Sequence, residues 1–100
     1  MPSQFILVDP GDLRLPPSHL GGVDLYKLQL QVAKYGTSIV GMPTPWVHRD
    51  KNGLLMLVDG VTRATRVAKY LPGQLITVEI TKDRPKADFG KLPTVRDKLP

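Results

Sequence analysis

Apolar residues along the chain fall into short runs that prolines and glycines separate, and the spacing within each run indicates an element. Residues 5–8 form an apolar run closed by Asp-Pro-Gly-Asp, which predicts a strand followed by a turn. Residues 13–22 contain two prolines and two glycines and predict a loop. Apolar side chains recur at three- and four-residue spacing over residues 25–35, so we predict a helix there that Asp24 caps and Gly36 ends.

The middle of the chain carries the pattern of a β-hairpin. Residues 37–45 contain a glycine and two prolines, which predicts an ordered loop and not a helix. Two runs at 46–49 and 54–58 flank Asp-Lys-Asn-Gly, and Asn-Gly between such runs is a strong hairpin signal. The second run is apolar on both faces, which predicts a central strand covered on each side.

A second helix and a last strand are predicted after the hairpin. From Val61 the spacing becomes helical, with small and aliphatic residues on one face and Arg63, Arg66 and Tyr70 on another. A Pro-Gly pair ends this helix. Residues 75–80 then alternate and are rich in β-branched side chains, which predicts a strand.

These elements together predict a small α/β (α+β) domain with a mixed β-sheet and two main helices. The length of 100 residues suits one domain. We expect a core at residues 1–80 and a basic, proline-containing C-terminal extension of the same domain at residues 81–100. Phe89, Leu92 and Val95 are the residues of this extension that are suited to fold back on the core.

The composition limits the chemistry that this domain can perform. The absence of cysteine excludes disulfides, thiolate metal sites and cysteine nucleophiles. A net charge of +5 suits an anionic partner such as nucleotide or nucleic acid, although it also serves solubility alone. The N-terminus does not resemble a signal peptide, and no apolar stretch approaches the roughly 18 residues that span a membrane. We therefore expect a cytoplasmic protein without a membrane partner.

The junction between the hairpin and the second helix is the main candidate site. A strand that enters a helix through Asp59-Gly60 leaves the first N–H groups of that helix without partners inside it. These donors and the helix dipole attract phosphate, and Gly60 lets a ligand approach the backbone. Arg63 and Arg66 share a face of the first two turns, where guanidinium groups suit phosphate oxygens. The alternative is that Gly60 only makes a tight turn while the arginines pair with Asp59, Glu79 or solvent.

The order of elements over residues 6–80 resembles the ParB/sulfiredoxin superfamily, and residues 59–63 (Asp-Gly-Val-Thr-Arg) resemble its Gly-x-x-Arg phosphate motif. The likeness is to the isolated N-terminal nucleotide-binding and nuclease domain of ParB. It implies a nucleoside triphosphate with Mg²⁺ as ligand. It also implies that four residues of the loop hold the phosphates: Gly60, Val61, Thr62 and Arg63.

Val61 departs from both branches of this superfamily. Sulfiredoxin carries its catalytic cysteine directly after the motif glycine, so Val61 excludes sulfinic-acid reduction by that mechanism. ParB proteins that hydrolyse CTP usually carry glutamate at this place, so Val61 also argues against hydrolysis in the manner of ParB.

Three residues are candidates for catalysis: Asp59, Arg66 and His48. Asp59 ends the strand beside the phosphate loop, and Arg66 is suited to stabilise charge there. His48 lies on a predicted strand and is either a general base or part of the sheet surface. No metal site is predicted from His48 and the distant His19. Asp9 and Asp12 either bind Mg²⁺ beside a triphosphate or close a turn.

These residues leave three functions open. The first is a domain that binds nucleotide or nucleic acid and that, if it is an enzyme, acts as a nuclease or nucleotide hydrolase. The second is a non-catalytic regulatory or adaptor module with a degenerate phosphate pocket and a protein partner. The third is a toxin-type nuclease domain.

Overall fold

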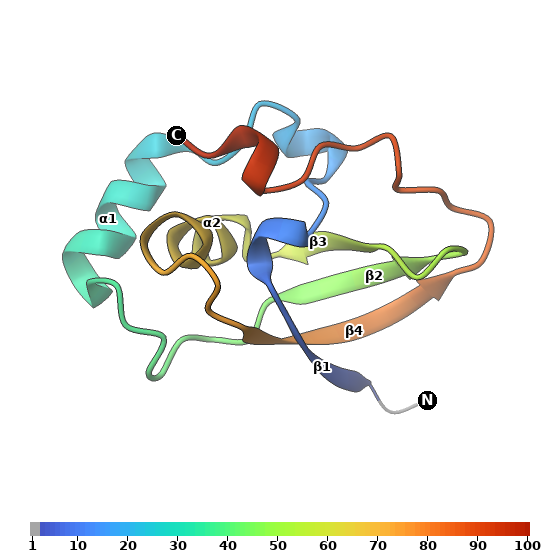
Figure 1. The fold of residues 1–100 in the computed structure, drawn as a ribbon, viewed down its shortest axis with the longest axis horizontal. Coiled ribbons are helices and arrows are strands. Elements are labelled where there is room, and N and C mark those ends of the chain that lie inside the picture. Colours follow the sequence, from blue (N-terminus) through green and yellow to red (C-terminus); the bar gives the residue numbers. More distant parts are fainter. Residues whose placement is uncertain (1–2) are drawn as a thin grey trace.

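Four strands form one mixed sheet in the order β1-β4-β2-β3 in the computed structural model, which describes residues 3–100 (Figure 1). β1 (Gln4–Val8) pairs antiparallel with β4 (Ile76–Arg84), and β4 pairs in parallel with β2 (Trp46–Asp50). β2 pairs antiparallel with β3 (Leu55–Asp59), as the hairpin signal predicts. This sheet and two helices make the small mixed α/β domain that the sequence predicts.

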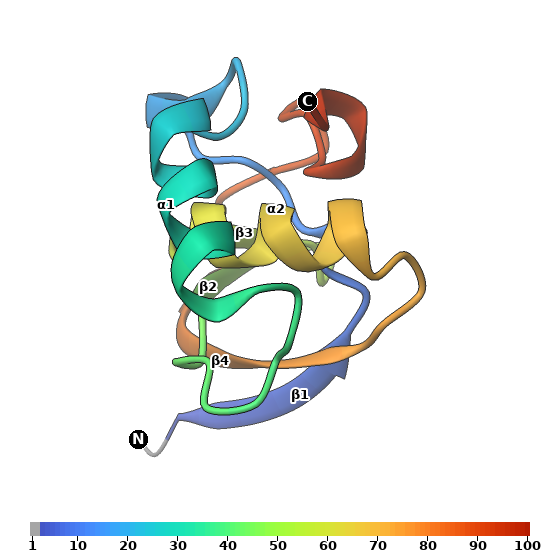
Figure 2. The ribbon, with the colours of Figure 1, turned by 90° about the vertical axis from the view of Figure 1, so that its left-hand side faces the viewer.

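The first helix, α1 (Leu25–Tyr35), begins and ends where the sequence predicts. The Asp24 carboxylate accepts hydrogen bonds from the N–H groups of the second and third helical residues, and Gly36 ends the helix with a φ of 62°. The second helix, α2 (Val61–Tyr70), follows β3 through the single residue Gly60. In Figure 2, α1 lies against α2, and both helices are on the same side of β1 and β4.

The core lies between α2 and the sheet. Leu13 and Leu15, in the segment predicted as a loop, are almost completely buried and join this core. Two short 3-10 helices, Pro10–Asp12 and Pro17–His19, flank them. Further buried core residues come from the strands, from α2 and from the C-terminal segment: Val47, Leu57, Val61, Ala64, Val67, Ala68, Ile76, Val78, Ile80 and Val95.

β3 is an edge strand, so the prediction of a central strand is wrong. The segment around Arg14 replaces a neighbouring strand, because the Arg14 N–H donates to Leu55 O at 2.8 Å and the Leu57 N–H donates to Arg14 O at 2.9 Å. Met56 and Leu57 are buried, whereas Val58 is half-exposed. The apolar character of β3 therefore reflects cover by an irregular segment far away in the sequence.

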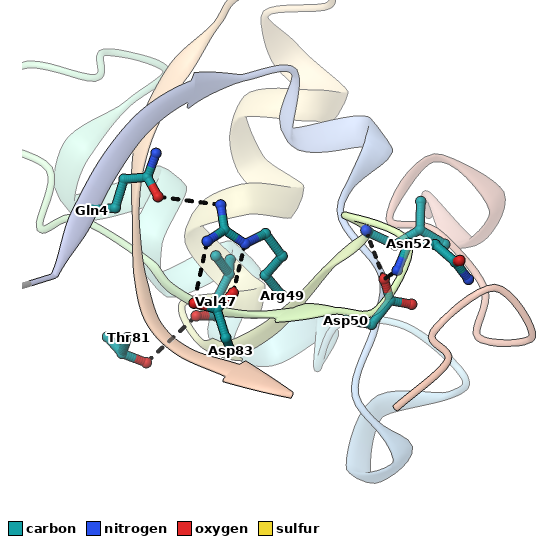
Figure 3. A network of polar contacts seen from close by, with 8 residues as sticks. Gln4, Val47, Arg49, Asp50, Asn52, Thr81 and Asp83 are labelled. Carbon is teal, nitrogen blue, oxygen red and sulfur yellow. Dashed lines mark hydrogen bonds and ion pairs between the residues drawn. The ribbon is translucent and has the colours of Figure 1, made fainter. Parts of the chain in front are cut away.

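β4 continues four residues beyond its predicted end at Ile80. It runs beside β2, and the guanidinium of Arg49 on β2 lies 2.7 Å from the Asp83 carboxylate (Figure 3). Farther along the chain, Phe89 and Val95 are buried and Leu92 is partly buried, so the C-terminal segment folds back on the core as predicted.

Asp50 ties the hairpin turn to this C-terminal segment, and Figure 3 shows its contact with Asn52 within the turn. Its side chain is almost fully buried, and it accepts hydrogen bonds from the N–H groups of Asn52, Leu54 and Phe89 at 2.8, 2.9 and 2.6 Å. Burial by itself raises the pKa of this carboxyl, but the three backbone donors outweigh burial and hold the pKa below its ordinary value. Asp50 is therefore ionised in the folded protein at neutral pH.

Within residues 3–100, neither helix has the length and apolar character needed to cross a membrane.

Candidate functional site

A pocket of about 520 Å³ lies where β3 ends and α2 begins. Its walls come from β2, β3, the first turns of α2, one face of α1, the 3-10 helix at 17–19 and the loop before β2. The seven residues that the sequence marks as catalytic or phosphate-binding candidates all line this one pocket: His48, Asp59, Gly60, Val61, Thr62, Arg63 and Arg66.

The Gly60 turn has the special backbone that the sequence predicts. Gly60 has a φ of 102°, in the left-handed region that side chains disfavour. A Cβ built on it would lie 2.8 Å from the Cβ of Pro45, so the turn has no room for a side chain. The first helical hydrogen bond runs from the Ala64 N–H to Gly60 O at 2.9 Å, and no side chain of the described residues caps the helix. The first residues of α2, which carry its uncapped N-terminal donors, thus line the pocket.

Arg63 forms an ion pair with Asp59, which was one of the alternatives predicted from the sequence. Its guanidinium lies 2.8 Å from the Asp59 carboxylate and also donates to Pro43 O at 3.3 Å. One of its terminal nitrogens would lie 3.0 Å from a Cβ built on Gly60, so the guanidinium covers the turn. The Arg63 guanidinium therefore lies beside the N-terminus of α2. An anion bound there would contact both the guanidinium and the start of the helix.

Arg66 does not lie on an open face with Arg63, and the alternative of pairing with Asp59, Glu79 or solvent does not hold for Arg66 either. The residue is only 1% exposed, and its guanidinium donates to Gly36 O at 2.9 Å and to Ser38 O at 2.8 Å. Helical spacing places Arg66 one turn from Arg63, but it does not show that the end of α1 covers this face of α2. Arg66 satisfies carbonyl groups at and after the C-terminus of α1, where a cation is also favoured by the helix dipole.

His48 enters the pocket wall from β2. Its Nδ1 atom is buried and has no hydrogen-bond partner among residues 3–100. Burial lowers the pKa of the imidazole, and the positive charges of Arg84 and Lys82 lower it further. The ring is therefore neutral at pH 7 and has one donor and one acceptor nitrogen.

Sequence reasoning missed the part of the pocket that α1 and the end of β4 supply. Lys27, Gln31 and Tyr35 follow one another at four-residue spacing, so they share one face of α1, and all three line the pocket. Arg84 comes from the end of β4, and His19, set aside as distant, also lines the pocket. The four-residue spacing was a visible signal, but nothing local indicated that this face meets the Gly60 turn.

The charge of the pocket favours an anionic ligand. Four permanently basic side chains line it: Lys27, Arg63, Arg66 and Arg84. The one acidic side chain in the lining is Asp59, which is already paired with Arg63. The excess positive charge has no other counter-charge in the lining, so an anion gains attraction from several sides.

The residues of the pocket do not fit a metal ion held by the protein. No group of three His, Cys, Asp or Glu side chains within residues 3–100 is arranged to hold one. Asp9 and Asp12 lie outside the pocket and pair with Arg96, and Asp9 also accepts from the Gly11 N–H at 2.9 Å. The Asp9 side chain therefore closes the turn, which was the alternative to Mg²⁺ binding, whereas the Asp12 carboxylate only pairs with Arg96.

No family model, curated protein or solved structure matches this chain. Any functional interpretation therefore depends on the geometry and charge of the pocket.

Proposed function

We propose that this chain is a ParB/sulfiredoxin-like domain that binds nucleotide or nucleic-acid phosphates at the Gly60 turn. The observation that carries the proposal is the meeting of an uncapped helix N-terminus with four basic side chains in one pocket that has a single, already paired carboxylate. Backbone N–H groups of α2 would donate hydrogen bonds to one phosphate oxygen, and the Arg63 guanidinium would donate to another.

A second candidate function is a non-catalytic regulatory or adaptor module that uses the same pocket. Two observations favour binding without turnover. Asp59 is engaged by Arg63, and no metal-binding group exists among the described residues. Any Mg²⁺ would therefore enter as a complex with a nucleoside triphosphate. If the domain is an enzyme, its activity is that of a nuclease or nucleotide hydrolase.

The test measures thermal stability and dissociation constants with inorganic phosphate, CTP, ATP and short single-stranded DNA and RNA, each with and without Mg²⁺. A ligand at about 100 times its Kd is expected to stabilise the fold by about 2.7 kcal/mol. Arg63→Ala is expected to weaken phosphate binding by about tenfold or more, because a hydrogen bond to a charged group contributes about 1.5–3 kcal/mol.

Arg49→Ala is the matched control. Arg49 also forms an ion pair with an aspartate, Asp83, but it lies outside the pocket lining (Figure 3). Its removal is expected to leave every Kd unchanged. The proposal is wrong if no ligand of the panel changes the melting temperature, or if the two variants weaken binding equally. The domain is an enzyme if it releases phosphate or cleaves nucleic acid and Arg63→Ala abolishes that activity. It is the adaptor if it binds a ligand without either reaction.

A further inference from the structure

We propose that two copies of this chain pair edge to edge through β1 and join their four-stranded sheets into one across a two-fold axis. β1 is an end strand of the sheet, and in Figure 2 it lies at the lower edge of the molecule. None of its residues lines the pocket at the Gly60 turn, so this inference is independent of the proposed function.

The two edges of the sheet differ in cover. At the β3 edge, the backbone of Arg14 bonds to Leu55 and Leu57 and takes the place of a further strand. β1 has no such cover, because beyond its ladder with β4 its backbone forms no hydrogen bond to any other segment of residues 3–100. Alternate residues of an antiparallel strand turn their N–H and C=O groups away from the partner strand. β1 therefore presents a row of free backbone donors and acceptors.

β1 also lacks the features that usually keep an edge strand from pairing. Proteins protect such edges with charged side chains, prolines or bulges. β1 reads Gln-Phe-Ile-Leu-Val, without a charge or a proline, and its register with β4 runs without a shift. Ile6 and Val8 pack against the core, whereas Phe5 and Leu7 are on the other face and are 59% and 66% exposed. This uncharged edge with exposed apolar side chains is suited to pairing with another strand.

The strand is self-complementary, which favours a second copy as the occupant. When two β1 strands run antiparallel and centre on Ile6, each Phe5 lies opposite the partner's Leu7 and Ile6 lies opposite its equivalent. Residues that meet in this register are an even number of positions apart, so free backbone groups of one strand meet free groups of the other. The Phe5 and Leu7 contacts lie on the outer face, and cross-strand contacts of this kind stabilise paired strands.

The distribution of charge agrees with pairing at this edge. Each copy carries a net charge of +5, so two copies repel one another, and they repel least where they meet through an uncharged strand. Glu79 on β4 pairs with Phe5 and is the acidic residue of β4 beside β1. The backbones of the two Glu79 residues would be three strand spacings apart, at least about 14 Å, which exceeds the Debye length of about 8 Å at physiological salt.

The length of the edge sets the expected strength. The five residues of β1 span about 17 Å at about 3.4 Å each. An interface of this length buries less than the roughly 1,200 Å² at which stable complexes begin, so the dimer is weak and reversible. We expect a dissociation constant in the micromolar range.

Sedimentation velocity of the wild-type chain from about 1 μM to about 1 mM tests the proposal. The mass is expected to rise from one copy to two and to stop there, because a two-fold interface uses the β1 edge of both copies. Raising the salt concentration from about 0.05 M to about 0.5 M is expected to tighten the dimer, since salt screens the repulsion between two basic copies. A chain that stays monomeric throughout overturns the proposal and leaves the edge to a strand of another protein. Association that salt weakens, or that continues beyond two copies, also overturns it.

Charged variants test the register. Phe5→Lys/Leu7→Lys places like charges opposite one another in the dimer, and so does Phe5→Glu/Leu7→Glu. Each double variant alone is expected to dimerise at least about tenfold more weakly than wild type. An equimolar mixture of the two is expected to regain the mass of two copies, because each lysine then lies opposite a glutamate.

Tyr26→Lys/Leu30→Lys is the matched control. Both residues are exposed on α1, and the change removes two large apolar side chains and adds two positive charges, as the lysine variant of β1 does. Its dimerisation is expected to stay within about threefold of wild type. An equal loss in this control would mean that association is unspecific, which overturns the proposal. A mixture of the oppositely charged β1 variants that stays monomeric overturns it as well.

Discussion

The Asp59 carboxylate lies 2.8 Å from the Arg63 guanidinium, one helical turn later in the chain, and both residues line the pocket beside the Gly60 turn, where we propose that phosphate binds. Asp59 would thus compete with such a ligand for Arg63 and would also repel an anion. Asp59→Asn is expected to tighten the binding of inorganic phosphate by up to about fivefold, because an exposed ion pair contributes up to about 1 kcal/mol. Calorimetric titration at low and high salt measures the change.

Asp83→Asn is the control for this prediction, since it releases Arg49 from an ion pair outside the pocket and is expected to leave phosphate affinity unchanged. Weaker binding in Asp59→Asn would contradict the competition and would show that Asp59 itself contributes to the bound state, for example through Mg²⁺.

Arg66 is predicted to be a residue on which the fold depends. Arg66→Met removes the donors to Gly36 O and Ser38 O, and a buried group left without its partner costs about 1–3 kcal/mol. We expect the free energy of unfolding to fall by about 3 kcal/mol in urea denaturation. Arg63→Ala, which breaks a partly exposed ion pair, is expected to cost less than about 1 kcal/mol. Equal losses in the two variants would mean that the buried bonds of Arg66 contribute little.

Gly60 is predicted to tolerate no side chain. Gly60→Ala adds the cost of a left-handed backbone, about 1–2 kcal/mol, and a contact at 2.8 Å with the Pro45 Cβ. Gly53→Ala isolates the first term, because Gly53 has a φ of 84° and nothing lies within 4 Å of its built Cβ. We therefore expect Gly60→Ala to lower the free energy of unfolding distinctly more than Gly53→Ala. The same loss in both would show that Pro45 moves aside freely.

Asp50 is predicted to make stability depend on acid pH. Its pKa is lowered in the folded state, so its contribution is complete above the unfolded pKa of about 3.9 and is lost as pH falls through the folded pKa. Asp50→Asn places an amide NH₂ against backbone N–H donors, and it is expected to destabilise the protein more at neutral pH than Asp83→Asn does. Urea denaturation between pH 7 and about pH 3 should show the gap between wild type and Asp50→Asn narrowing. A gap that does not change with pH would contradict the prediction.

Several local features could be predicted from the sequence with good accuracy. The capping of α1 by Asp24, its end at Gly36, the hairpin turn and the left-handed Gly60 all depend on residues close together in the chain. Part of the pocket wall followed from the same local reasoning, because the strand end, the turn and the start of α2 are one continuous segment, residues 56–63.

The rest of the pocket wall depends on residues that meet only after folding. Gln31 on α1 and Arg84 at the end of β4 are far from residue 60 in the chain, and no spacing rule relates them to it.

The sequence by itself therefore determined the main helices and strands and the left-handed backbone of the Gly60 turn, since hydrogen bonding and backbone conformation there are local. Only the tertiary structure decided that β3 lies at the sheet edge and that Arg66 is buried under the end of α1. It also decided that α1 supplies the far wall of the pocket. The reason is physical: which helix face becomes buried depends on what packs against it, and those partners come from distant parts of the chain.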